Sequence, residues 1–209
     1  MSIKIFLADD HRIMREGLRA MLEKKGGLEV IGEAGDGRTA VRLVKEMRPD
    51  IIIMDIGMPE LNGIEATRRI IKNCPGVKII ALSIHSDKRL VSEMLKAGAS
   101  GYVLKEAAFS ELIDAIHTVK RGCSYISVEI QDVINKKLSK HPLYSELTDR
   151  EREVLQLLAE GKSTKQIASC LDVSAKTIDS HRQQIMKKLN MHSVAQLTKY
   201  AIREGITSI

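Results

Sequence analysis

Short apolar runs alternate with helix-length amphipathic segments through the first 120 residues of this 209-residue chain. Five runs predict strands, at 3–8, 28–34, 50–54, 77–82 and 101–104. Five segments predict helices, at 12–25, 37–47, 61–73, 87–97 and 109–120. Repeated strand–helix units favour an α/β domain in which helices cover both faces of a parallel, doubly wound sheet.

Four of the predicted strands end in polar side chains. Asp9 and Asp10 follow the first strand, Asp55 the third, Ser83 the fourth and Lys105 the fifth. The carboxyl ends of parallel strands meet at one edge of an open sheet, and such sheets bind their ligands there. We therefore expect these side chains to lie close together.

Three carboxylates at one edge repel one another and are not all ionised cheaply without a cation. Oxygen ligands favour Mg²⁺, and the carbonyl of Gly57, two residues past Asp55, is a further accessible oxygen. A carboxylate such as Asp55 is also a competent nucleophile toward phosphorus. Lys105 and Ser83 would then stabilise the phosphoryl oxygens by charge and hydrogen bonding.

Each of these residues also has an ordinary interpretation when it is taken alone. The Asp9–Asp10 pair suits a helix cap, and Asp55 suits a turn before Pro59. Ser83 alone suggests a loop hydroxyl and Lys105 a solvated charge. Compatible chemistry at four strand ends together favours the functional interpretation.

The pattern weakens between 122 and 146. A short amphipathic helix is expected at 127–138, with four apolar residues on one side: Val128, Val133, Ile134 and Leu138. The stretch 139–142 then indicates a linker. Three scattered cysteines fit neither a disulfide framework nor a zinc site, which favours a reducing compartment. We expect no signal peptide and no membrane span.

An all-helical unit follows, with helices expected at 149–160, 164–171, 175–190 and 193–204. Capping boxes mark three of these starts, among them Thr148 with Glu151. Only 172–174 separates the second helix from the third. So short a turn predicts a helix-turn-helix.

Positive charge is segregated within this helical unit, although residues 141–209 as a whole carry only +2 of the chain's net +6. Between Lys162 and Arg203 lie eight basic and two acidic residues, whereas 141–161 and 204–209 hold two basic and six acidic residues. A solvated helical face is the ordinary interpretation, but the short turn and this segregation favour a surface that contacts nucleic-acid phosphates.

Residues 3–120 closely resemble the receiver domain of bacterial response regulators. The motifs that carry the resemblance are Asp9-Asp10, the segment from Asp55 to Pro59, Gly63, Ser83 and Lys105. The resemblance implies a flavodoxin-like five-stranded sheet of strand order 2-1-3-4-5. It also implies that Asp55 accepts phosphate from a sensor histidine kinase. Mg²⁺ would be held by Asp10, Asp55 and the Gly57 carbonyl, with Asp9 acting through water.

The same resemblance implies a conformational switch. Ser83 and Tyr102 stand where family members carry a hydroxyl and an aromatic residue that move together on phosphorylation. Lys105 follows three residues after Tyr102 and would contact the phosphate. A small change of charge would thereby bias a two-state element.

Residues 147–206 resemble the LuxR-type helix-turn-helix, and the whole chain resembles the NarL/FixJ subfamily of response regulators. The resemblance places the DNA-binding motif at Thr164 to Gln183, with 175–190 in the major groove. Asp179 stands where a relative often has Lys; Asp would repel phosphate but accept from a cytosine amino group. Expected DNA contacts are Lys165, Lys176, Thr177, Asp179, Ser180, Arg182, Gln183 and Lys187.

These resemblances predict a receiver at 1–121, a linker at 122–146 and a helix-turn-helix domain at 147–209. The implied protein is a cytoplasmic transcription factor, not an enzyme beyond self-dephosphorylation. It would dimerise on phosphorylation or on double-stranded DNA, with RNA polymerase as a further candidate partner. Two alternatives are a constitutive DNA-binding protein with a structural receiver, and a Mg²⁺-dependent phosphatase. The phosphatase interpretation is weakened because such enzymes commonly separate two Asp by one residue, whereas Asp9 and Asp10 are adjacent.

Overall fold

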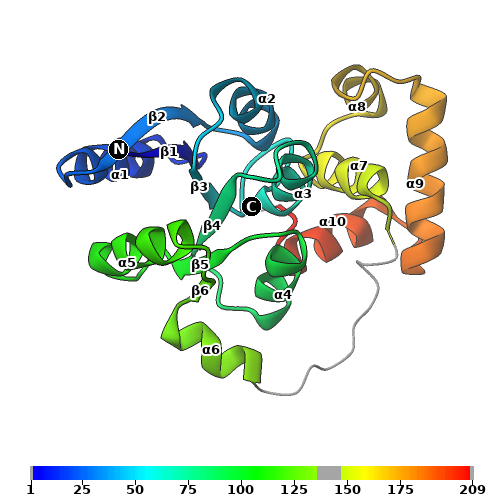
Figure 1. Ribbon diagram of the computed structural model, residues 1–209. Helices are drawn as coiled ribbons and strands as arrows, with labels where there is room; N and C mark the ends of the chain where they lie inside the picture. The colour runs from blue at the N-terminus through cyan, green and yellow to red at the C-terminus, as the bar shows by residue number, and fades with distance from the viewer. Residues whose placement is uncertain (1, 136–146, 208–209) are drawn as a thin grey trace. The chain divides into compact units, whose positions relative to one another are not determined.

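The computed structural model describes residues 2–135 and 147–207. Its internal contacts divide the chain into an N-terminal unit, residues 1–137, and a C-terminal unit, residues 138–209. Figure 1 shows an α/β arrangement in the first unit and helices alone in the second. The predicted limits at residues 121 and 147 are not tested by this division and stay a prediction.

The N-terminal unit is built on one parallel sheet. Its strands are β1 (Ile3–Ala8), β2 (Leu28–Ala34), β3 (Ile51–Asp55), β4 (Lys78–Ser83), β5 (Gly101–Leu104) and β6 (Tyr125–Ile126). The order is β2-β1-β3-β4-β5-β6. The predicted order 2-1-3-4-5 is thus confirmed, but the sheet has a sixth strand. A two-residue strand has no apolar periodicity to predict it, and it exists here because it pairs with β5.

Five helices cover this sheet, close to the predicted ranges. They are α1 (Arg12–Glu23), α2 (Gly37–Met47), α3 (Gly63–Asn73), α4 (Lys88–Lys96) and α5 (Phe109–Lys120). Asp36, Asn62 and Asp87 accept backbone N–H groups at the starts of α2, α3 and α4. Such caps satisfy donors that the first helical turn leaves unpaired.

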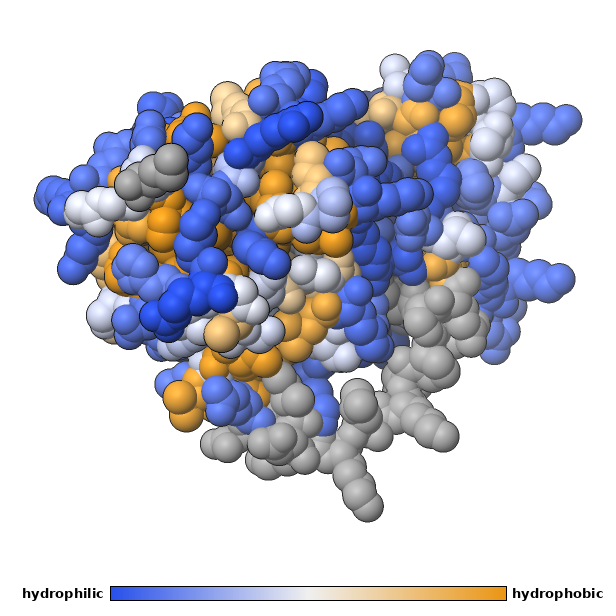
Figure 2. All heavy atoms as spheres, in the orientation of Figure 1, coloured by the Kyte–Doolittle hydropathy of each residue, from blue (hydrophilic) through white to orange (hydrophobic). Residues whose placement is uncertain are grey.

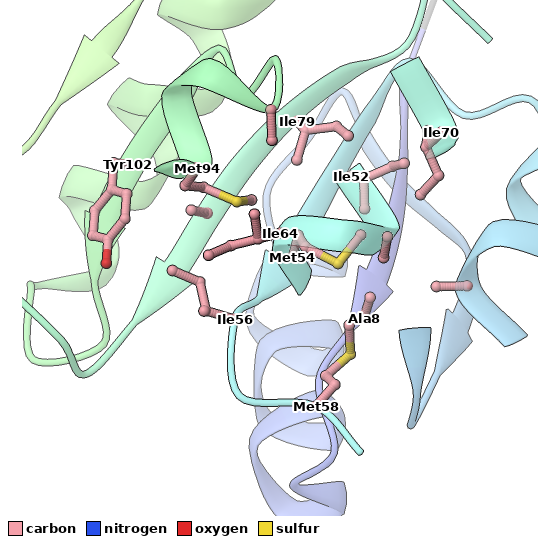
Figure 3. Packing of buried hydrophobic residues seen from close by; sticks show 14 of the residues in the cluster. Ala8, Ile52, Met54, Ile56, Met58, Ile64, Ile70, Ile79, Met94 and Tyr102 are labelled. Atoms are coloured by element: carbon pink, nitrogen blue, oxygen red, sulfur yellow. The ribbon is translucent and has the colours of Figure 1, made fainter. Parts of the chain in front are cut away.

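Alternation along the strands divides the core into two layers. Ile5 and Leu7 of β1 pack with α1 and α5, whereas Phe6 and Ala8 pack on the opposite face, with α2, α3 and α4. Successive strand residues point to opposite faces, so both layers can be apolar only if nearly every strand residue is apolar. Figure 3 shows part of the second layer, where Met54 and Ile64 lie close together.

A further helix, α6 (Val128–Asn135), follows β6. It lies within the range predicted for a helix, but the predicted apolar face is wrong at Val128, which is 69% exposed. Ile130 is instead fully buried in the layer formed with α2, α3 and α4. The other three members of the predicted face, Val133, Ile134 and Leu138, have side chains outside the described residues.

In the described part of the C-terminal unit, residues 147–207, four helices form as predicted. They are α7 (Asp149–Ala159), α8 (Thr164–Cys170), α9 (Ala175–Leu189) and α10 (Val194–Arg203). The capping boxes of Thr148 with Glu151 and of Ser163 with Gln166 are both formed. One hydrophobic cluster joins all four helices, including Leu155, Ile178 and Leu197.

Candidate functional site

The carboxyl edge of the sheet brings together an ammonium and two carboxylates. Lys105, just after β5, lies 2.7 Å from Asp9 Oδ2 and 2.8 Å from Asp55 Oδ2. Both acids are nearly buried, at 3% and 6% exposure. Because β1 and β5 flank β3 and β4, the strand order alone places these three residues on one rim. The predicted convergence of Asp9, Asp55 and Lys105 is confirmed in the structure.

Asp10 and His11 extend the polar cluster that Asp9 and Asp55 begin. Ligand atoms of Asp9, Asp10, His11 and Asp55 all lie within 4.8 Å of one another. The His11 ring is 2.8 Å from Asp10 Oδ1 and 3.2 Å from Asp9 Oδ1. The sequence analysis missed His11, although its position directly after the acid pair was the available signal.

The alternative capping role of the acid pair is only partly realised. His11, not an aspartate, is the N-cap residue of α1, and its side chain caps nothing. Asp9 Oδ1 accepts the backbone N–H of His11 at 2.8 Å, while its other oxygen contacts Lys105. Asp9 therefore fixes the start of α1 and lines the rim at the same time.

Two glycines shape the backbone around Asp55. A Cβ on Gly63 would lie 1.9 Å from the Asp55 carbonyl oxygen, so only glycine lets α3 begin this close to β3. Gly57 has open space around the equivalent position, and its N–H lies 3.4 Å from Asp55 Oδ1. Gly57 therefore keeps its backbone next to the acids without being required sterically.

Burial governs the electrostatics of this rim. Burial, and then the nearby charge of Asp9, raises the pKa of Asp55, while Lys105 offsets part of that rise. Burial also acts to lower the pKa of Lys105, but its hydrogen bonds to Asp55 and Asp9 prevail, so the pKa is raised. The ammonium is therefore charged at neutral pH and holds the carboxylates together.

Ser83 and Tyr102, the predicted switch pair, meet around the loop that follows β4. Ser83 is 1% exposed, and its Oγ accepts the N–H of His85 at 3.1 Å. Tyr102 is fully buried, and its hydroxyl donates to the His85 carbonyl at 2.7 Å. Mainly because of burial, the pKa of Tyr102 rises to about 12. Its phenol stays neutral and available as a donor.

A second candidate surface lies on α8 and α9. The structure joins these helices through residues 171–174, and Ser174 caps α9 by accepting the N–H of Thr177 at 3.1 Å. Ile178, Ile185 and Leu189 hold α9 on the core of its own unit. A helix-turn-helix is therefore present where the sequence predicted it.

The outward side of α9 is polar. Lys176, Ser180, Gln183 and Lys187 are exposed, as is Lys165 on α8, while Thr177, Asp179 and Arg182 are partly exposed. Figure 2 shows hydrophilic side chains along this helix. Arg182 lies 3.1 Å from Asp179, so these two predicted contact residues neutralise each other in the free protein. None of the eight predicted contact residues is buried.

A doubly wound sheet with an acid-and-lysine rim, followed by a helix-turn-helix, is the architecture expected of a DNA-binding regulator. Residues 5–117 match the response regulator receiver domain family, and residues 145–201 match the bacterial regulatory proteins of the luxR family. The chain belongs to the two-component response regulators that carry a LuxR-type DNA-binding domain.

Relatives match almost the whole chain. The transcriptional regulatory protein DegU of Brevibacillus brevis is 38% identical and covers 97% of this chain and 94% of its own length. The response regulator UvrY of Escherichia coli (strain K12) is 36% identical, over 98% of this chain and 95% of its own. These relatives place the chain among NarL/FixJ-type response regulators.

A solved structure matches both units. RcsB from Salmonella enterica serovar Typhimurium, bound to promoter P1flhDC in the presence of the phosphomimetic BeF3⁻, is 27% identical, with a TM-score of 0.62. That match covers 99% of this chain and 100% of RcsB. Among the described residues, no helix has the length and apolar character needed to cross a membrane.

Proposed function

We propose that Asp55 is the phosphate acceptor through which a sensor histidine kinase controls DNA binding by this protein. The observation that carries the proposal is the contact of buried Asp55 with Lys105, beside Asp9, at the carboxyl edge of the sheet. A buried carboxylate with a charged lysine beside it can receive a phosphoryl group whose negative oxygens the same lysine then stabilises.

The proposed transfer is a substitution at phosphorus. An Asp55 oxygen forms the new O–P bond while the N–P bond of a phosphohistidine breaks, and the imidazole nitrogen keeps the electron pair. Lys105 would release its contact with Asp55 and pair with the phosphoryl oxygens, while Asp9 continues to hold it. Return of the phosphoryl group to water by self-dephosphorylation is the only turnover that we propose.

Mg²⁺ fits the donors on this rim. Asp10 and Asp55 offer carboxylate oxygens, the adjacent Gly57 offers a carbonyl, and Asp9 would act through a water molecule. Oxygen donors of this kind suit a hard cation that retains part of its water shell. Bound there, Mg²⁺ would neutralise the charge on the transferring phosphoryl group.

The switch would begin at Ser83. Its hydroxyl is already placed on the loop that Tyr102 holds through His85. A phosphoryl oxygen on Asp55 offers Ser83 a stronger, charged acceptor. We propose that Ser83 turns toward it and that Tyr102 changes its contacts with the loop at the same time.

The response to phosphorylation would be binding of duplex DNA by the C-terminal unit. We propose that α9 enters the major groove, with lysines and hydroxyls on phosphates and Asp179, Ser180 and Gln183 at base edges. The DNA-bound structure of the similar RcsB supports this placement. We further propose that the protein binds DNA as a dimer on half-sites about one helical turn apart. It would contact RNA polymerase and act in the cytoplasm.

Replacing Asp55 tests the phosphate acceptor. Full-length chain is treated with acetyl phosphate and Mg²⁺, and its affinity is measured for a duplex chosen by in vitro selection. Wild type should gain affinity, whereas Asp55→Asn should gain none. Asp114→Asn, the same change at an exposed site on α5, is the control and should behave as wild type. Equal stimulation of Asp55→Asn would refute the assignment.

The same samples test the two alternatives. A constitutive DNA-binding protein would show tight binding that acetyl phosphate leaves unchanged in wild type. A Mg²⁺-dependent phosphatase would turn over p-nitrophenyl phosphate many times per chain. We expect neither result.

A further inference from the structure

The segment that follows α5 is attached to the strand that carries Tyr102. Strand β6 extends the sheet beyond β5, with Tyr125 opposite Gly101 and Ile126 opposite Tyr102. Figure 1 shows β6 beside β5, with α6 following directly. Tyr125 and Ile126, which lie in the predicted linker, are therefore part of the receiver sheet.

Backbone hydrogen bonds fix this attachment at Tyr102 itself. The N–H of Tyr125 donates to the Ser100 carbonyl at 3.1 Å. The N–H of Ser127 donates to the Tyr102 carbonyl at 3.0 Å. Ser127, the residue directly before α6, is thus bonded to the main chain of the switch tyrosine.

Side chains hold the same residues in place. The Ser127 hydroxyl, fully buried, donates to the carboxylate of Glu111 on α5. The Ser127 carbonyl accepts from the N–H of Ile130 at 3.0 Å and so begins the α6 turn. Ile130 is fully buried in the cluster that contains Tyr102, and α6 packs against α4.

Covering the exposed edge of β5 is the simpler function for such a segment. Edge covering needs only the two ladder positions of β6. It does not need a fully buried hydroxyl bonded to α5, nor an isoleucine packed in the cluster of the switch tyrosine. These extra contacts couple the segment to α5 through Glu111 and to the cluster around Tyr102 through Ile130.

We propose that residues 125–131 are the output element of the receiver, and that Ser127 is the positioning residue that couples them to Tyr102. The inference rests on the proposed function, because it takes phosphorylation of Asp55 to change the contacts of Tyr102. Rearrangement of Tyr102 alters the carbonyl that Ser127 bonds and the packing around Ile130. The segment therefore shifts, and it directly precedes the chain that leads to α7.

Amide exchange in the full-length wild-type chain tests the coupling without any substitution. Exchange is measured with Mg²⁺ alone and with Mg²⁺ plus BeF3⁻ as a stand-in for the phosphoryl group. We expect the amides of Ser127 and Ile130 to change their exchange rate, because Ser127 bonds the carbonyl of Tyr102 and Ile130 bonds the carbonyl of Ser127 within the shifting segment. The amide of Leu22 in α1, far along the chain from Tyr102, serves as the internal reference.

Ser127→Ala keeps the backbone bond to Tyr102 but removes the hydroxyl bond to Glu111 that holds the segment in position, so it tests whether this positioning matters for output. We expect unchanged phosphorylation of Asp55 but an affinity gain for DNA smaller by about fivefold, the factor equivalent to one lost hydrogen bond. Ser124→Ala, the same change at an exposed position of the same segment, should keep the full gain. If Ser127 had only a structural role, Ser127→Ala would lower the stability of the protein but would keep the full increase in DNA affinity on phosphorylation.

Two results overturn the inference by themselves: a full affinity gain in Ser127→Ala, or amides at 127 and 130 that ignore BeF3⁻. If Ser127→Ala does not fold, the exchange experiment on wild type decides. A wild-type chain that gains no affinity on phosphorylation overturns the proposed function and this inference together. A normal wild-type gain that persists in Ser127→Ala overturns this inference alone.

Discussion

Single residues in this protein serve two opposed requirements. Asp55 must be buried enough to contact Lys105, yet burial raises its pKa and disfavours its charged form. Lys105 resolves the conflict by contacting Asp9 and Asp55 together. Asp179 on α9 would face the same tension, because in the proposed DNA complex its carboxylate would oppose the phosphates, while in the free protein it pairs with Arg182.

Asp179→Asn tests the second of these conflicts. Removing the carboxylate frees Arg182 and abolishes repulsion from the phosphates, so we expect general DNA affinity to rise by roughly tenfold. Discrimination at one base position should fall by about 1–3 kcal/mol, because a carboxylate accepts from a cytosine amino group and an amide discriminates differently.

Salt titration distinguishes these effects for Asp179→Asn. The slope of log affinity against log salt should steepen by about one unit, since one more cation acts on the phosphates. Asp114→Asn, outside α9, should leave slope and discrimination unchanged. An unaltered slope in Asp179→Asn would mean that the carboxylate does not face the duplex.

At the scale of elements, helix starts decide where the site residues lie. The close approach of α3 to β3 places Gly63 against the Asp55 carbonyl. The capping box of α7 uses Glu151, which also reaches Lys188 of α9 at 2.7 Å. Each contact joins two elements, so a substitution at either position should change the free energy of unfolding of its unit.

Gly63→Ala should destabilise the N-terminal unit by about 3 kcal/mol, because its Cβ would overlap backbone atoms that cannot move aside. Gly57→Ala is the matched control, since nothing lies within 4 Å of the added atom. We expect the control to stay within about 0.5 kcal/mol of wild type. Urea unfolding of both variants measures the difference, and equal losses would contradict the packing described at α3.

Glu151→Gln removes the ion pair with Lys188, so we expect it to destabilise the C-terminal unit at pH 7. The loss should be only about 1–2 kcal/mol, because solvent around Lys188 weakens the pair. Glutamine keeps the capping box, so the loss isolates the ion pair. Although burial acts to raise it, the pKa of Glu151 is lowered by Lys188 and Thr148.

That lowered pKa fixes the pH dependence of the Glu151 contribution. The stabilisation is fully present above the unfolded pKa of 4.5 and is lost as pH falls through the lower folded value. The difference in unfolding free energy between wild type and Glu151→Gln, measured by urea unfolding, should therefore vanish at a pH below the folded pKa of Glu151. A difference that persists there would assign the effect to the cap instead.

At the scale of the whole molecule, each unit has its own core and its own charge pattern. The N-terminal unit holds the acidic rim, and the basic residues of the C-terminal unit concentrate between Lys162 and Arg203. Separate cores allow each unit to unfold on its own. Mg²⁺ without a phosphoryl group should therefore stabilise the N-terminal unit and leave the unfolding of the C-terminal unit unchanged.

Magnesium tests this independence. We expect thermal unfolding in two transitions, and Mg²⁺ at about one hundred times its dissociation constant should stabilise the N-terminal unit alone by about 2.7 kcal/mol. Calorimetry with and without Mg²⁺ measures both transitions. Asp10→Asn, which removes one exposed oxygen donor, should abolish most of the shift. A shift of both transitions would show that the units do not unfold independently.

Much of the fold and of the rim could be predicted because the signals are local. Apolar runs predicted β1 to β5, and the cap of Thr148 with Glu151 predicted the start of α7. The α8–α9 turn needed only a short gap between two helical patterns. Asp55 and Lys105 could be paired because parallel strands end on one edge, although 50 residues separate them.

Contacts that depend on pairing between distant segments could not be read in this way. The two residues of β6 are too few to show a periodic pattern. Ile130 rather than Val128 is buried because the side of α6 that carries Ile130 packs against α4 and the cluster around Tyr102. His11 was missed because a single histidine after two acids has many ordinary roles.

The amino-acid order by itself determined the succession of strands and helices, the strand ends that bear acids and lysine, and the position of the helix-turn-helix. Periodicity and capping act within a few residues, so they are written along the chain. Only the tertiary structure decided that Lys105 holds two acids at once and that Ser127 bonds both Tyr102 and Glu111. Those contacts exist because non-neighbouring strands and helices are packed together, and packing distances are not encoded in any local pattern.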